Sequence, residues 1–171
     1  EDMEPGSLDT TVLQQVPNFS FPSGAYGCVV EIDKQTGDTR IRNMYLVDDC
    51  GTVISPLLAE GQVHGGVAQG IAQALYEEVK YDENGQPTTG TFVDYLIPAA
   101  PELPNFTASR ISTPTPNNTL GAKGIGESGS VGAPPAVINA VVNALRHLGV
   151  THVDMPATPQ KIWRILQGGA K

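Results

Sequence analysis

The segment of this sequence most suited to chemistry is a glycine-rich stretch, residues 117–137, that carries a single acid. It reads NNTLGAKGIGESGSVGAPPAV and places Glu127 among Gly121, Gly124, Gly126, Gly129 and Gly132. Glycine allows the backbone to come close to a bulky ligand, because it has no side chain. A carboxylate held beside such a ligand could act as a general base. The residues alone leave a structural alternative open, in which Glu127 caps the helix that begins near Pro134 or faces solvent.

Three known loop motifs fail to explain this stretch. GIGESG, residues 124–129, has the letters of a dinucleotide-binding loop, but that motif must follow a strand, and STPTPNNTLGAK cannot be a central strand. Glu127 would also face a pyrophosphate with like charge. Lys123 precedes its glycines instead of following them, so the P-loop pattern fails. Ser128 lacks the G-x-S-x-G context of a hydrolase nucleophile. What remains is a carboxylate on a flexible loop just before a helix.

Composition narrows the class of protein. The chain has 171 residues and a formal net charge of −8, which would repel a phosphate backbone, so we expect no nucleic-acid partner. No apolar run approaches the roughly 20 residues of a membrane span, so we expect none. The first residues, EDMEPGSLDT, lack the basic and apolar regions of a secretory signal, and Cys28 and Cys50 lack metal-site spacing. These features favour a cytoplasmic protein with two free thiols.

Hydrophobic patterning predicts an α+β fold. Strands are expected at 25–33, 39–49, 91–98 and 107–114, the first two forming an antiparallel hairpin around a turn at 34–38. Helices are expected at 59–82, 133–149 and 159–167, with a long loop at 114–131 and a turn at Asn84–Gly85. Residues 1–20 are interpreted as an irregular strap or linker, and 21–171 as a single domain. The expected order mixes strands and helices without a strict βαβ alternation.

The first predicted helix contains an unusual number of glycines near its start. They are Gly61, Gly65, Gly66 and Gly70. Each glycine inside a helix costs about 0.5–1 kcal/mol relative to alanine, so another contact must offset them. The close approach of another backbone, or of a ligand, would supply that contact.

Four ordered segments carry a family resemblance. They are DDCGTVISP (48–56), GQVHGGVAQGIAQALYEE (61–78), TFVDYLIP (91–98) and LGAKGIGESG (120–129). In this order they resemble the C-terminal part of the molybdenum-binding large subunit of the xanthine dehydrogenase family, especially its aerobic carbon monoxide dehydrogenase branch. The resemblance implies a portion of the molybdopterin-binding domain of that subunit, with a mixed or antiparallel sheet and packed helices.

The resemblance also implies cofactors and partners. The family oxidises small molecules such as carbon monoxide, aldehydes or N-heterocycles with oxygen derived from water. Its molybdenum is held by molybdopterin, as the cytosine dinucleotide in many bacterial members. Electrons leave through [2Fe-2S] clusters on a small subunit to FAD on a medium subunit. The expected partners are therefore these two subunits, the remainder of the large subunit and a small-molecule substrate.

Site residues follow from the same resemblance, position by position. Glu127 matches the active-site base of the family. The other matches are to residues near the cofactor: Gly124, Ile125 and Gly126 in the glycine loop, Gly61 and Gln62 in the helix, and Asp48, Asp49 and Lys123. No residue is assigned as a metal ligand, and His64 is interpreted as a polar neighbour of the site.

The chain supplies only part of such a subunit, so the isolated chain is expected to be inactive. The alternative is a non-catalytic relative, a binding or assembly protein that keeps the fold but holds no molybdenum. Glu127 and the intact GQVHGG segment favour the enzyme, since a chain that never met the cofactor would have no chemical need for them.

Overall fold

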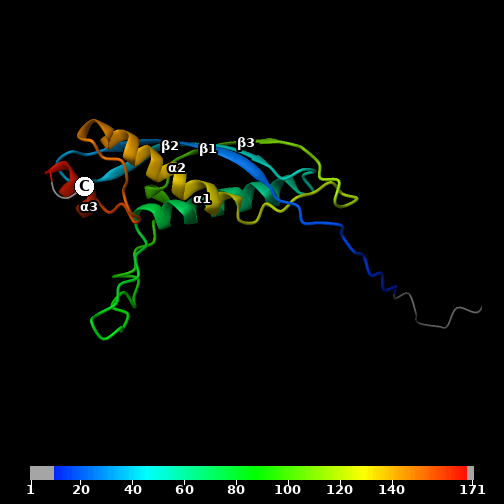
Figure 1. Cartoon of the computed structure of the whole chain (residues 1–171), viewed down its shortest axis with the longest axis horizontal. Coiled ribbons are helices and arrows are strands. Elements are labelled where there is room, and N and C mark those ends of the chain that lie inside the picture. Colours follow the sequence, from blue (N-terminus) through cyan, green and yellow to red (C-terminus); the bar gives the residue numbers. More distant parts are fainter. Residues whose placement is uncertain (1–9, 169–171) are drawn as a thin grey trace, which may run out of the picture.

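Three strands form the sheet against which the helices of this protein pack. The computed structural model describes residues 10–168. The strands are β1 (Ser23–Ile32), β2 (Thr39–Asp49) and β3 (Phe106–Ile111), in the spatial order β1-β2-β3. The helices are α1 (Pro56–Leu75), α2 (Ser128–Leu145) and α3 (Pro159–Leu166), with short 3-10 helices at Ala100–Glu102 and Arg146–Leu148. Helices α1 and α2 run side by side along the sheet (Figure 1).

The predicted hairpin is confirmed. β1 and β2 pair antiparallel from Ser23 opposite Asp49 to Ile32 opposite Thr39, with one irregularity between Val29 and Val30. In β2, Met44 and Leu46 are buried beneath the helices, whereas Tyr45 between them is 48% exposed on the other face. This alternation, in which successive side chains point to opposite faces, fixes the register of the hairpin.

A parallel crossover joins β2 to β3. After β2, the chain forms α1 and returns to β3, which pairs parallel to β2 from Met44 opposite Phe106 to Asp49 opposite Ile111. The strand expected at 107–114 is thus present, one residue earlier at its start and shorter at its end. The sheet is mixed, as the expected α+β class requires.

Helices α1 and α2 both differ from the prediction in their boundaries. Helix α1 starts at Pro56, where the Ser55 hydroxyl accepts a hydrogen bond from the Leu58 amide, and it ends at Leu75, well before residue 82. At this end the amide of Glu77 donates to the carbonyl of Ala72, which breaks the regular helical pattern. Helix α2 starts at Ser128 instead of residue 133, so the long loop expected to reach 131 ends at Glu127. The small side chains of its first turns allow this early start.

The strand predicted at 91–98 is wrong. Residues 91–95 form turns, and residues 96–99 have no regular structure. Phe92 and Val93 are 81% and 85% exposed, and no described strand lies beside them to supply pairing partners. The predicted Asn84–Gly85 turn is present, with Gly85 at a φ of 79°. The segment between α1 and β3 projects away from the sheet and helices (green in Figure 1).

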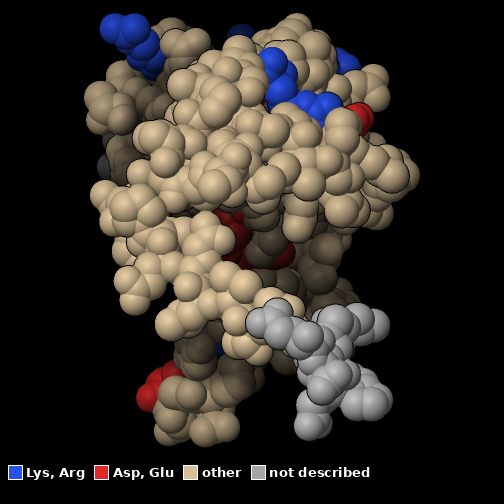
Figure 2. Space-filling model, turned by 90° about the vertical axis from the view of Figure 1, so that its right-hand side faces the viewer, with Lys and Arg blue, Asp and Glu red and all other residues tan. Residues whose placement is uncertain are grey.

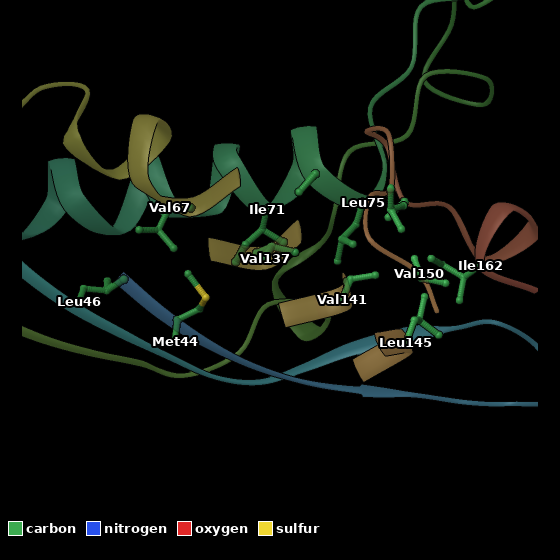
Figure 3. Packing of buried hydrophobic residues seen from close by; sticks show 14 of the residues in the cluster. Met44, Leu46, Val67, Ile71, Leu75, Val137, Val141, Leu145, Val150 and Ile162 are labelled. Atoms are coloured by element: carbon green, nitrogen blue, oxygen red, sulfur yellow. The ribbon is translucent and has the colours of Figure 1, made fainter. Parts of the chain in front are cut away.

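The main hydrophobic core lies between the sheet and the two long helices. Met44 and Leu46 of β2 face Val67 and Ile71 of α1 and Val137 of α2 (Figure 3). Ile162 of α3 closes one end of this core, whereas Trp163 is 42% exposed. Within residues 10–168, no helix has the length and apolar character needed to cross a membrane.

Helices α1 and α2 touch through glycines. A Cβ atom on Gly129 would lie 2.6 Å from the Val63 carbonyl oxygen and from the Val67 nitrogen. On α1, a Cβ on Gly66 would lie 2.9 Å from the Ser130 nitrogen, whereas one on Gly61 would meet nothing within 4 Å. Close approach of another backbone therefore explains Gly66, and the contact of Gly70 with Ala133 and Pro134 has the same basis. It does not explain Gly61.

Asp49 fastens the chain around the C-terminal end of β2. Its Oδ1 accepts from the amides of Gly51 at 2.8 Å and Thr113 at 3.0 Å, and Lys123 Nζ lies 3.4 Å away. Hydrogen bonds from Thr113, through its side chain and its amide, and from the Gly51 amide lower the pKa of Asp49 well below its usual range. The Asp49 carboxylate thus joins the end of β2 to Thr113 and to Lys123, which lie on the two sides of the loop around residue 118.

The glycine contact predicts opposite effects of one substitution at two positions of α1. Gly66→Ala should lower the free energy of unfolding by about 1–3 kcal/mol, because the new methyl group meets the backbone of α2. Gly61→Ala, the matched control, should raise it by about 0.5–1 kcal/mol through helix propensity alone. Urea denaturation of the full-length, cofactor-free protein measures both. Equal effects of the two variants would contradict the packing argument.

The Asp49 contacts predict a pH-dependent loss of stability in Asp49→Asn. The pKa of Asp49 is lower in the folded protein than in the unfolded chain, so its stabilising effect is present above the unfolded pKa of about 4. It is lost as the pH falls through the folded pKa. The melting temperature of the variant should lie below that of the wild type at pH 7, and the gap should narrow below about pH 4. The exposed Asp94→Asn serves as the control, and a gap that does not depend on pH would refute the charge-based explanation.

Candidate functional site

A cavity of about 730 Å³ opens between the start of β1 and the first turns of α2. Figure 2 shows this end of the molecule, where acidic atoms lie at the bottom of a hollow. Three of the predicted site residues in the glycine loop region line the cavity, namely Gly124, Gly126 and Glu127, and Asp48 lines it from β2. The remaining lining residues come from the chain before and within β1 and from α2: Phe21, Pro22, Ser23, Gly24, Tyr26, Ser128, Val131, Gly132, Pro135, Ala136 and Asn139.

Glu127 is the residue that immediately precedes α2. Its carbonyl oxygen accepts from the amide of Val131 at 3.0 Å and from the hydroxyl of Ser130 at 3.0 Å. Its side chain makes no capping hydrogen bond and is exposed. The side chain therefore does not cap the helix, which rules out one form of the structural alternative, whereas its exposure agrees with the other form, in which Glu127 faces solvent. Glu127 also lines the cavity.

The glycine loop presents its backbone openly before Glu127. A Cβ atom on Gly124 or on Gly126 would meet no atom within 4 Å. Ile125, between them, is partly buried against the core and anchors the loop. The two glycines are therefore not required by packing within the described residues, in contrast to Gly66 and Gly129. Their open surface lies directly on the cavity.

Two hydrogen-bonded side chains, the partly buried Tyr26 and the buried Asp48, also line the cavity. The Tyr26 hydroxyl lies 2.9 Å and 3.1 Å from the two carboxylate oxygens of Asp48 and donates to them. Asp48 is 1% exposed, and its burial raises the pKa of its carboxyl group, against the lowering effects of the Tyr26 hydrogen bond and of Arg110. Burial and the Asp48 hydrogen bond together raise the pKa of Tyr26 far above its usual value.

Sequence reasoning missed Tyr26 and Ser128. The alternation of the 25–33 strand pointed Tyr26 to the same face as Cys28, and the register of the hairpin then brings it close to Asp48. Ser128 follows the acid, and its Oγ is buried without a hydrogen-bond partner among the described residues. The Thr39 hydroxyl is in the same condition, so this feature alone does not identify a binding site.

Five predicted residues lie outside the cavity lining, and Ile125, which packs against the core, is one of them. Gly61 and Gln62 are exposed on α1, and Gln62 lies one turn before Gly66, on the side of α1 that meets the start of α2. Asp49 and Lys123 bind each other behind the loop, and the Lys123 side chain is only 13% exposed. The proposed role of Lys123 as a phosphate or pterin neighbour is therefore without support in its position.

The described residues contain no cluster of three or more His, Cys, Asp or Glu side chains arranged to hold a metal ion. The ring of His64 instead packs on Phe106, with ring centroids 5.4 Å apart.

Comparison with known proteins places this chain in a family. Residues 4–104 match the model of the molybdopterin cofactor-binding domain. The chain is 44% identical to the carbon monoxide dehydrogenase large chain of Hydrogenophaga pseudoflava over 165 residues, covering 96% of this chain and 20% of that protein. It is 41% identical to the nicotine 6-hydroxylase large subunit of Paenarthrobacter nicotinovorans, with the same coverage.

Solved structures agree with these relatives. Quinoline 2-oxidoreductase from Pseudomonas putida 86 superposes with a TM-score of 0.83 and 45% identity, over 86% of this chain and 19% of that chain. Reconstituted carbon monoxide dehydrogenase from Oligotropha carboxidovorans gives a TM-score of 0.86 at 41% identity, over 89% and 19%. The chain spans about 20% of the length of the curated relatives it matches. It therefore belongs to the molybdopterin cofactor-binding domain family, within the group of large subunits that includes the carbon monoxide and xanthine dehydrogenases.

Proposed function

We propose that this chain is the part of a molybdenum hydroxylase large subunit that presents the catalytic base, Glu127, to the substrate. The observation that carries the proposal is the contrast between the backbone and side chain of this residue. The Glu127 backbone starts α2, whereas its carboxylate is exposed at a cavity and makes no capping hydrogen bond. An acid that the fold does not use, held at a fixed helix start, is available for proton transfer.

The residues at the cavity fit the molybdopterin cofactor. The Ser128 hydroxyl is buried with no hydrogen-bond partner among residues 10–168, and a cofactor oxygen or nitrogen would satisfy it. The backbone at Gly124 and Gly126 is open to close approach. The first amides of a helix also lack internal acceptors, so the start of α2 favours an electron-rich group. Gln62 can donate and accept hydrogen bonds from the adjoining α1, where a Cβ atom on Gly61 or Gly65 would meet nothing within 4 Å.

When bound, the cofactor supplies the oxidation of the substrate with oxygen derived from water. The role of this chain is to hold the cofactor edge with the loop backbone and Ser128, and to place the Glu127 carboxylate beside the reacting carbon. Glu127 accepts the proton released as the oxygen is added to the substrate. A carboxylate fixed by a helix start avoids the entropy cost of being ordered during the reaction.

The finer parts of the proposal come from the family resemblance. We infer that the cofactor is the cytosine dinucleotide form and that the substrate is a small molecule such as carbon monoxide, an aldehyde or an N-heterocycle. The remaining length of the large subunit completes the site. Partner subunits with [2Fe-2S] clusters and FAD carry the electrons away. A non-catalytic relative without molybdenum would have no structural need for Glu127, since its side chain makes no capping bond.

The role of Glu127 predicts a large loss of turnover in Glu127→Gln. The amide keeps the size of the side chain but cannot accept the proton, so kcat should fall by about 10²–10⁴-fold. The molybdenum content of the purified complex should not change. Glu83→Gln, an exposed acid in the projecting segment, is the matched control and should keep full activity. Wild-type turnover in Glu127→Gln would reduce this residue to a structural one.

The missing length predicts that the chain is inactive by itself. The chain spans about 20% of the length of its curated relatives, so the isolated chain should reduce no artificial electron acceptor with any candidate substrate. Molybdenum analysis of the complex isolated from its own cells tests whether the complete protein holds the metal. Near-stoichiometric molybdenum is expected there, and a molybdenum-free complex would support the non-catalytic relative.

A further inference from the structure

We propose that Tyr26 is a positioning residue that fixes Glu127 at the cavity by wedging its ring between the sheet and Gly132 of α2. This inference rests on the proposed function of Glu127. It assigns a task to a residue that contacts neither the glycine loop nor, in this proposal, the reacting atoms. Three contacts support it, one at each side of the start of α2 and one that ties the wedge to the sheet.

The first contact fixes the start of α2 from the side of α1. Gly129 lies two residues after Glu127 and rests directly on the α1 backbone between Val63 and Val67, with no space for a methyl group. This contact limits how closely the two helices approach. It does not stop the start of α2 from rolling over the surface of α1, because a contact between two helix backbones acts as a pivot.

The second contact opposes that rolling motion. A Cβ atom on Gly132 would lie 2.6 Å from both Cδ2 and Cε2 of Tyr26, so the phenol ring already touches the helix backbone. Gly132 lies five residues after Glu127, about one and a half helical turns along α2. The start of α2 is thus held between α1 on one side and an aromatic ring on the other.

The third contact keeps the ring in place. The Tyr26 hydroxyl donates to Asp48, at 2.9 Å and 3.1 Å from its two oxygens, and Asp48 is fixed in β2 at 1% exposure. No other direct side-chain hydrogen bond to Asp48 occurs among residues 10–168. Arg110, opposite Asp48 in β3, is the cation whose charge acts on it. A buried carboxylate satisfied mainly by one phenol holds that phenol strongly.

The consequence is a continuous line of contact from β2 to Glu127, through Asp48, the Tyr26 ring and Gly132. A shift of about 1 Å in a catalytic group can cost about 10²-fold in rate. The wedge therefore has a catalytic effect without any contact to substrate. It also explains why a glycine is needed at residue 132, inside a helix where alanine would otherwise be favoured.

The test uses the assembled enzyme with Gly132→Ala and Tyr26→Phe. Gly132→Ala pushes the start of α2 away from the ring and should lower kcat by about 10–100-fold, with KM within about 3-fold of the wild type. Tyr26→Phe keeps the ring but loses the bond to Asp48, so a smaller loss of about 3–10-fold is expected. Gly27→Ala on β1, where a Cβ would have 4.0 Å of clearance, is the matched control and should leave kcat unchanged.

Two further readouts separate positioning from general damage. Amide hydrogen exchange in residues 128–133 should speed up in Tyr26→Phe and stay at the wild-type rate in Gly27→Ala. Molybdenum and released pterin should remain at wild-type levels in all three variants. Loss of the cofactor in both single variants, Gly132→Ala and Tyr26→Phe, would overturn the proposed role of Tyr26. Wild-type kcat and wild-type hydrogen exchange in both variants would overturn it as well.

The decisive arm repeats Gly132→Ala in the Glu127→Gln background. If the wedge acts by placing Glu127, Gly132→Ala should cost little once that carboxylate is gone, so the two losses should not add. A full 10–100-fold loss in this background would show that Gly132 acts independently of Glu127 and would overturn the inference. Wild-type turnover in Glu127→Gln alone would refute the proposed function instead, and hydrogen exchange would still report on the wedge.

Discussion

Two helix backbones meet at Gly66 and Gly129 without a side chain between them, and the position of the candidate site follows from that contact. Because α2 can lie this close to α1, its first turn reaches the edge of the sheet and delivers Glu127 to the cavity. The contact also allows α2 to begin before its two prolines, Pro134 and Pro135, which would otherwise be expected at a helix start. The packing of Gly66 against Gly129 thus determines the position of Glu127.

Sequence patterns predicted the elements that local rules control. The hairpin of β1 and β2, β3 and the Thr158–Pro159 start of α3 follow from alternation, turn residues and capping. The start of α2 could not be predicted in this way. A glycine-rich segment favours a loop by itself, and it becomes helical here because it packs against α1. The wrong strand at 91–98 has the opposite cause. Phe92 and Val93 have strand-like side chains, but no described strand lies beside them.

Only part of the candidate site could be predicted from the sequence, because only some of its residues lie in one local motif. A motif marks Glu127, Gly124 and Gly126, because their chemistry is local to one loop. Tyr26 comes from a strand about a hundred residues earlier, and only the register of the hairpin and the packing of α2 bring it to the cavity. The family resemblance added Asp48 but could not say that the partner of its carboxylate is a phenol.

The three acids of this region show how the fold separates structural from chemical work. The Asp49 carboxylate accepts hydrogen bonds from two amides and lies close to Lys123. These contacts favour its charged form and join the end of β2 to the loops that follow it and precede α2. Its neighbour Asp48 is buried, and burial disfavours its charged form. The side-chain hydrogen bond that Asp48 accepts within residues 10–168 comes from Tyr26. Glu127 makes no capping bond with its side chain, whereas its carbonyl oxygen accepts from the Val131 amide at the start of α2. Fixed backbone combined with an uncommitted carboxylate is the arrangement that proton transfer requires, and the other two acids make it possible by holding the surrounding segments in place.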